Sequence, residues 1–134
     1  MPGTFVITPL YAGALGLWFL VLSVRVVLGR AGPGRPSLGD GGDPMMQRRI
    51  RGHANFGEYV PLALLLIALL ELAGQPAWVL HALGATLLLG RLLHGWAFSF
   101  TAYWAFGRSA GIALTFLALA AASLLCLHVG LQRL

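Results

Sequence analysis

Four long apolar runs constrain this chain more than any other feature of its sequence. They cover approximately residues 5–28, 54–73, 77–100 and 110–129. Each run is close to the ~20 residues that an α-helix needs to cross ~30 Å of hydrocarbon. Backbone N–H and C=O groups find no water in lipid, so such runs must be helical. The pattern predicts an all-α fold, an integral membrane four-helix bundle that forms a single domain over residues 1–134.

The composition excludes a water-soluble globule and a disordered chain. Of the 134 residues, 58% are hydrophobic and 10% are charged, whereas a soluble domain has about 45–50% and about 25%. A chain of this size cannot bury so much apolar surface in its own core, so membrane lipid is the expected partner. The formal charge of +5 lies on arginines beside apolar runs, which indicates membrane topology rather than nucleic-acid binding.

The arginines also predict the orientation in the membrane. The connection over residues 29–47 and the residues just after it carry Arg30, Arg35, Arg48, Arg49 and Arg51. The turn at 74–76 carries none, and the third connection ends at Arg108. The positive-inside rule therefore predicts a cytoplasmic 29–47 loop and both termini on the opposite, non-cytoplasmic side. Because no basic residue precedes the first run, we expect a retained helix and not a cleaved signal peptide.

The second helix is predicted to extend beyond its apolar run. Asp43 is a suitable N-cap, and Pro44 suits the first helical turn. A start near Pro44 gives a helix of about 30 residues and ~45 Å, longer than the bilayer core is thick. The Gly- and Pro-rich loop before it has no apolar periodicity and is expected to be a linker or a mobile cap.

A polar stripe continues from the start of this helix into the membrane. Arg48, Arg51, Asn55 and Glu58 follow a 3-4-3 spacing and share one helix face, whereas His53 points away from it. A carboxylate inside a span is costly unless it is paired, so Glu58 should face a bundle interior or a cavity. Two interpretations stay open: a ligand site, and an intrahelical pair of Glu58 with Arg51 that only fixes packing.

Two further polar sets are predicted at the same end of the bundle. On the third helix, Arg91, His94 and Phe98 are spaced i, i+3 and i+7, and Arg91 is too deep to leave unpaired. Its expected partner is Glu58 or another acid from a neighbouring helix or subunit. The fourth helix is expected to open with Gly107-Arg108-Ser109, an arrangement that binds anions and stabilises thiolates. A structural ion pair and a simple positive-inside anchor are the competing interpretations.

Together these sets suit a ligand with several carboxylates, an ammonium group and a reactive anion. Glutathione is such a ligand, and arginine is well suited to capturing carboxylates. We expect no metal.

The second helix resembles the signature of the MAPEG superfamily, the membrane-associated proteins in eicosanoid and glutathione metabolism. Its pattern, R-x-x-R-x-x-x-N-x-x-E-x-x-P, is carried here by Arg48, Arg51, Asn55, Glu58 and Pro61. The run Gly-Arg-Leu-Leu-His at 90–94 and Arg108 also resemble family positions. The likeness covers nearly the whole chain and is greatest to a small bacterial branch, which implies a bacterial inner (cell) membrane.

The resemblance implies a homotrimer that binds glutathione as co-substrate at subunit interfaces. It assigns contacts with glutathione to Arg51, Asn55, Glu58 and Tyr59, with Arg48 and His53 nearby. By the same resemblance Arg91 and His94 line the site from the third helix. Arg108, with Ser109, takes the catalytic role of stabilising the thiolate.

Two departures from the family pattern leave the function open. Enzymes of this family that act on eicosanoids often have tyrosines where this chain has Phe98 and Ile112, so two hydroxyl groups are missing. The favoured interpretation is a glutathione transferase or peroxidase acting on lipophilic electrophiles. The alternative is a catalytically degenerate membrane binding or scaffold protein.

Two other classes of function are weaker candidates. Small multidrug transporters are also short four-helix proteins, but they resemble chains with a key glutamate in the first helix, and here that helix has no acid. Di-haem ligation would use the histidines His53, His81, His94 and His128.

Overall fold

The computed structural model describes residues 5–134, and all the regular secondary structure in that range is helical. The four helices are α1 (Ile7–Gly29), α2 (Pro44–Leu72), α3 (Ala77–Ser99) and α4 (Ala105–Leu131). Each is long and apolar enough to cross a membrane. The prediction of an all-α protein with four membrane-spanning helices is confirmed.

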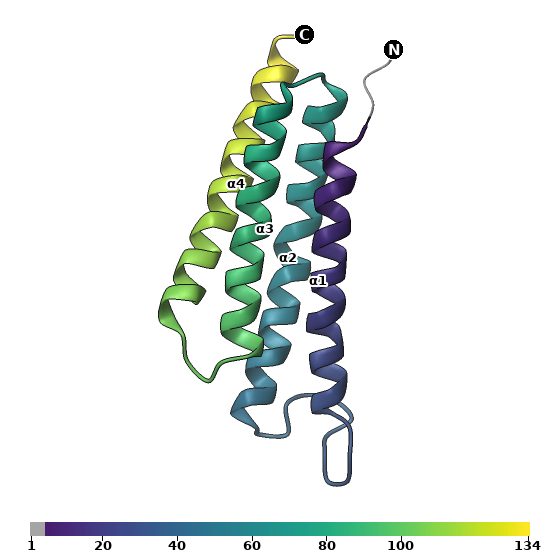
Figure 1. Ribbon diagram of the computed structural model, residues 1–134, viewed down its shortest axis with the longest axis vertical. Helices are drawn as coiled ribbons and strands as arrows, with labels where there is room; N and C mark the ends of the chain where they lie inside the picture. The colour runs from purple at the N-terminus through teal and green to yellow at the C-terminus, as the bar shows by residue number, and fades with distance from the viewer. Residues whose placement is uncertain (1–4) are drawn as a thin grey trace.

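The helices form an elongated bundle in which α2 and α3 are central (Figure 1). Each of these two helices contacts the three others. In contrast, α1 and α4 do not contact each other within the described part of the chain. The start of α1, the α2–α3 turn and the end of α4 lie at one end of the bundle. The α1–α2 and α3–α4 connections lie at the other, which we call the arginine-rich end because it carries Arg30, Arg35, Arg48, Arg49 and Arg108.

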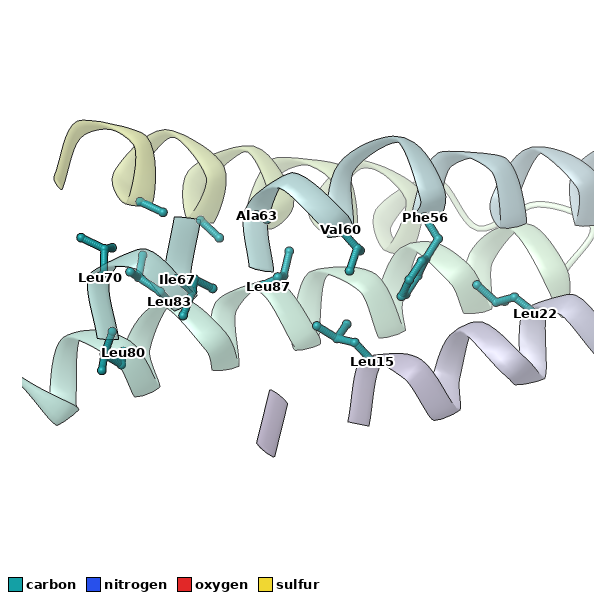
Figure 2. Close-up of a cluster of buried hydrophobic side chains, with 12 residues drawn as sticks. Leu15, Leu22, Phe56, Val60, Ala63, Ile67, Leu70, Leu80, Leu83 and Leu87 are labelled. Atoms are coloured by element: carbon teal, nitrogen blue, oxygen red, sulfur yellow. The ribbon is translucent and has the colours of Figure 1, made fainter. Parts of the chain in front are cut away.

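The interior is a narrow column of apolar side chains, mostly from α1, α2 and α3 (Figure 2). Fully buried members include Leu15, Ile67, Leu70 and Leu87. Outside this column the helices present large apolar side chains to their surroundings, and the buried residues of α1 are only Thr8, Leu15, Leu22 and Gly29. Such a surface is stable in lipid or against another apolar chain, not in water.

The start of α2 agrees with its prediction. The Oδ1 atom of Asp43 accepts a hydrogen bond from the Met45 amide at 2.9 Å, and Pro44 occupies the first helical position. These two residues reduce the number of unpaired N–H groups in the first turn of α2. The Asp43 side chain accepts a hydrogen bond from one of them, and proline has no backbone N–H group. The helix then continues through Pro61 to Leu72.

The start of α4 differs from its prediction. The helix begins at Ala105, two residues before the expected Gly107, so Arg108 is its fourth residue and not its second. The Arg108 amide already donates to the carbonyl oxygen of Trp104 at 3.1 Å. The Arg108 amide is therefore not one of the free N–H groups of the helix end, and of the three residues in the expected anion site only Gly107 lies within the first turn. The apolar run begins later than the helix, because the first turn of α4 lies before its most apolar segment.

Helices α3 and α4 approach closely where two glycines face each other. A Cβ atom added at Gly111 would lie 2.6 Å from the His94 amide nitrogen and 2.8 Å from the Gly90 carbonyl oxygen. Only residues without a side chain permit this contact between backbones. The crossing fixes how α3 is rotated toward α4, and it therefore positions the polar residues of α3 that follow.

Candidate functional site: a polar cleft between α2, α3 and α4

The centre of the site is a buried arginine held by uncharged partners. Arg91 on α3 has no exposed surface. Its Nη1 atom donates to Asn55 Oδ1 on α2 at 2.8 Å and lies 3.5 Å from Thr115 Oγ1 on α4. Its Nε atom has no hydrogen-bond partner among residues 5–134. Among residues 5–134 Arg91 is paired neither with Glu58, the expected partner, nor with another acid. Amide and hydroxyl oxygens orient the guanidinium and leave its charge uncompensated within the chain.

Arg91 also determines the hydrogen-bonding state of His94. The Nη2 atom of Arg91 lies 3.2 Å from Nδ1 of His94, one helical turn later. A guanidinium can only donate, so Nδ1 is the acceptor and the ring carries its hydrogen on Nε2. His94, which is 4% exposed, is thereby a neutral imidazole with one N–H group left to offer.

The polar stripe of α2 divides into an inner and an outer part. Asn55 points inward to Arg91, whereas Arg51 and Glu58 form an exposed ion pair, with an Nη1–Oε1 distance of 3.2 Å. Their side chains are 58% and 47% exposed. Arg48 reaches across to the end of α3, where it donates to the carbonyl oxygens of Ala97 and Thr101 at 2.8 and 3.1 Å. The intrahelical pair of Arg51 with Glu58 is present, and it coexists with a cavity beside it.

Phe98 lies between two of the arginines. The Arg48 guanidinium carbon is 5.0 Å from the centre of the Phe98 ring, and that of Arg108 is 5.6 Å away. The ring also stacks on His94 at 4.6 Å. These distances are within the range of cation–π attraction, which orients a guanidinium without neutralising it.

These residues surround a cleft of about 250 Å³ at the arginine-rich end of the bundle. We call it the polar cleft, and its walls are Arg51, Asn55, Tyr59, His94, Phe98, Arg108, Ile112 and Phe116. The cleft thus brings together predicted site residues from α2, α3 and α4 that are far apart in the sequence.

The other predicted site residues do not line the polar cleft. Glu58 borders it through its pair with Arg51, and Arg48 and Arg91 support its walls from behind. His53 lies on the α1 side of α2, where it bonds the Ser23 hydroxyl at 3.1 Å and stacks on Phe19. Ser109 is exposed and is not among the lining residues.

Sequence reasoning missed Thr115 and Phe116. The Thr115 hydroxyl donates to the Gly111 carbonyl oxygen at 2.8 Å and leaves its lone pair facing Arg91. A single threonine in an apolar helix gives no positional signal, because its hydroxyl usually bonds its own helix. Phe116 forms part of the cleft wall and contacts Tyr59, but it is indistinguishable in sequence from a lipid-facing phenylalanine.

The fold and the cleft define an integral membrane protein of four helices with a polar site at one end. A model of the MAPEG family matches residues 8–128, and the chain belongs to this family. It is similar to inner membrane protein YecN of Escherichia coli strain K12, with 36% identity over 114 residues that cover 84% of each chain. The protein of the same name from Escherichia coli O6:H1 has the same identity and coverage. No solved structure matches the chain significantly.

Proposed function

We propose that this protein binds glutathione in the polar cleft and transfers it to lipophilic electrophiles or uses it to reduce lipophilic hydroperoxides. The observation that carries the proposal is the convergence of Arg51, Tyr59, His94 and Arg108 from three helices on one cavity. Arginine recognises carboxylates through paired N–H donors, and glutathione has two carboxylates. Membership of the MAPEG family supports the same assignment.

Arg108 is the residue to which we assign thiolate stabilisation. Its guanidinium lines the cleft and contacts Phe98, and no carboxylate within residues 5–134 is paired with it. A cation near the sulfur favours the thiolate over the thiol, and the thiolate is the nucleophile. Ser109 is exposed outside the cleft, so we assign the role to Arg108 alone.

The proposed reaction is nucleophilic attack by the glutathione thiolate. With an electrophilic carbon, a C–S bond forms while the leaving group departs with its electron pair, and the thiol proton is released to water. With a hydroperoxide, the thiolate sulfur attacks the terminal oxygen, the O–O bond breaks, and the alkoxide that leaves takes up a proton from water to give the alcohol. A second glutathione then converts the sulfenic acid to the disulfide and water. Phe116 and Ile112 form the apolar wall of the cleft, through which a substrate dissolved in the bilayer would approach.

The test compares Arg108→Gln with Arg133→Gln in purified protein. Arg133 is a matched control because it is also an exposed arginine, but it lies at the opposite end of the bundle, where it donates to the carbonyl oxygen of Ala73. We expect Arg108→Gln to abolish the ultraviolet thiolate band of bound glutathione and to lower kcat/KM toward chlorodinitrobenzene by roughly tenfold or more. Equal thiolate formation in both variants would remove Arg108 from the mechanism.

A second candidate function is glutathione binding without turnover. Phe98 and Ile112 line the cleft, and neither offers a hydroxyl group to the sulfur or to a leaving group. The two functions are separated by one comparison on the wild-type chain: a binder gives saturable glutathione affinity by calorimetry and no product with several electrophiles, whereas an enzyme gives both.

We propose further that the chain functions as a homotrimer in a bacterial inner membrane. The exposed pair of Arg51 and Glu58 supports this assembly, because exposed charges within a span are costly in lipid and a second copy would cover them. Light scattering of the detergent-solubilised protein tests the stoichiometry. Reporter fusions at the two termini test the orientation, which the positive-inside rule gives as non-cytoplasmic for both.

A further inference from the structure

A second cavity lies at the arginine-rich end of the bundle, under the α1–α2 connection. It has a volume of about 470 Å³ and is lined by Arg25, Leu28, Gly29, Arg35, Asp43, Met45, Met46 and Arg49. We call it the arginine pocket. It shares no lining residue with the polar cleft, and the proposed function makes no use of it.

The arginine pocket has an excess of positive charge. Three guanidinium groups line it against one carboxylate. Asp43 pairs with Arg35 at 3.5 Å through Oδ2, and its Oδ1 atom is engaged as the N-cap of α2. Asp43 thus compensates Arg35, and the charges of Arg25 and Arg49 remain.

Arg25 and Arg49 are positioned by partners that do not neutralise them. The Nη2 atom of Arg25 donates to the Ser99 carbonyl oxygen at 2.7 Å, and its guanidinium carbon lies 4.4 Å from the centre of the Phe100 ring. Arg49 donates from Nη1 to the Arg25 carbonyl oxygen at 3.3 Å. Its Nε atom is buried and has no hydrogen-bond partner among residues 5–134.

Two other features of the arginine pocket favour a negatively charged ligand. The pocket lies at the N-terminus of α2, which begins at Pro44, and the positive end of a helix dipole attracts anions. Gly29 lets Met46 and Arg49 of α2 approach the end of α1, since an added Cβ atom would overlap Met46 Sδ and lie 3.1 Å from Arg49 Nη1. Beside it, Leu28 is 60% exposed and provides an apolar exit toward the bilayer.

We propose that the arginine pocket binds a phosphate group through Arg25 and Arg49. Phosphate oxygens match the paired N–H donors of a guanidinium. The phosphate has two possible sources, the headgroup of an anionic phospholipid and a small soluble phosphate. The exposed Leu28 beside the cavity suits an acyl chain attached to the phosphate and so favours the lipid. The experiment tests both sources.

The experiment measures ligand-dependent thermal stabilisation of the full chain in detergent. The ligands are phosphatidylglycerol, phosphatidylcholine and inorganic phosphate, each compared with chloride at equal ionic strength. The variants are Arg25→Gln, Arg49→Gln and the control Arg133→Gln. We expect ligand to raise the thermal midpoint of the wild-type chain in a saturable way. Arg25→Gln and Arg49→Gln should each lower the apparent affinity by about tenfold, the effect of losing one charge-assisted hydrogen bond. Arg133→Gln should change the affinity less than twofold.

The pattern of responses identifies the source of the phosphate. Saturation by phosphatidylglycerol alone identifies a lipid headgroup, and saturation by inorganic phosphate identifies a soluble ligand. If Arg25→Gln and Arg49→Gln do not fold, Arg25→Lys and Arg49→Lys replace them, since lysine keeps the charge and loses the paired N–H donors, and a weakened response in those variants supports the proposal. Absence of saturation by all three ligands, or equal effects in the pocket variants and in Arg133→Gln, would overturn it.

Discussion

The Nη1 atom of Arg91 on α3 lies 2.8 Å from Oδ1 of Asn55 on α2, and both side chains are buried between helices. The contact joins a charged donor to a neutral acceptor, so it orients the guanidinium and leaves its charge available to the site. Because Arg91 also bonds His94, Asn55 indirectly fixes an imidazole that lines the polar cleft. Stability and the geometry of the cleft therefore depend on the same pair.

Removing the Asn55 acceptor should destabilise the bundle. Asn55→Leu leaves a buried guanidinium without its shortest side-chain hydrogen bond, and we expect a loss of about 1.5–3 kcal/mol. Denaturant unfolding in detergent measures the change. Asn55→Asp, which keeps the oxygen, should retain most of the stability, and the exposed Arg51→Gln should cost under about 1 kcal/mol. A fully stable Asn55→Leu variant would show that the contact contributes nothing.

A methyl group at Gly111 should disrupt the crossing of α3 and α4. The nearest atoms to an added Cβ are the amide nitrogen and Cβ of His94 and the carbonyl oxygen of Gly90, which cannot move aside as the end of a flexible side chain can. We expect Gly111→Ala to lower the free energy of unfolding by about 1–3 kcal/mol. Gly13→Ala is the matched control, because nothing lies within 4 Å of its added Cβ. Equal stability of the two variants would contradict the close crossing.

Glu71 should hold the first turn of α1. Its carboxylate at the end of α2 accepts hydrogen bonds from the amides of Val6, Ile7 and Thr8 at 2.7–2.8 Å. We expect Glu71→Ala to cost about 1–2 kcal/mol, as the loss of a strong N-cap does. Hydrogen exchange should accelerate at these amides and not in α3. Glu71→Gln keeps one oxygen and should be intermediate, so identical exchange in both variants would argue against capping.

The Phe98 ring should help to orient the arginines of the polar cleft. Both Arg48 and Arg108 lie over it, and a cation–π contact contributes about 0.5–2 kcal/mol. We expect Phe98→Leu to weaken glutathione binding by several-fold in calorimetry. Phe106→Leu is the control, because Phe106 is exposed and lies outside the cleft. Unchanged affinity in Phe98→Leu would leave the ring a packing residue only.

The sequence predicted the helices well because hydropathy and capping act locally. Asp43 and Pro44 begin α2 as expected, and the end of α3 at Ser99 is one residue from its predicted boundary. The start of α4 was predicted two residues late, since the helix begins at Ala105 and was expected to open with Gly107, whereas the apolar run begins only near residue 110. The first turn of α4 contains the exposed Phe106 and is followed by the charged Arg108. Because Arg108 interrupts the apolar run, hydropathy does not distinguish this turn from a loop.

The polar partners were less predictable than the helices. Spacing along α2 correctly placed Arg51 beside Glu58, because residues seven apart in a helix share a face. It did not predict that Arg91 would bond Asn55 and Thr115, or that Arg25 would bond Ser99. Those contacts join different helices and depend on how each helix is rotated about its axis.

The sequence by itself determined that this chain is an all-helical membrane protein with its charge gathered at one end. In lipid every backbone N–H and C=O group must be hydrogen-bonded within the protein. An apolar run of this length meets that requirement by forming an α-helix. Only the tertiary structure decided which charges become partners. The close approach of Gly90 and Gly111 sets the rotation of α3 against α4. That rotation turns Arg91 toward neutral oxygens and leaves Arg51 and Glu58 to each other at the surface.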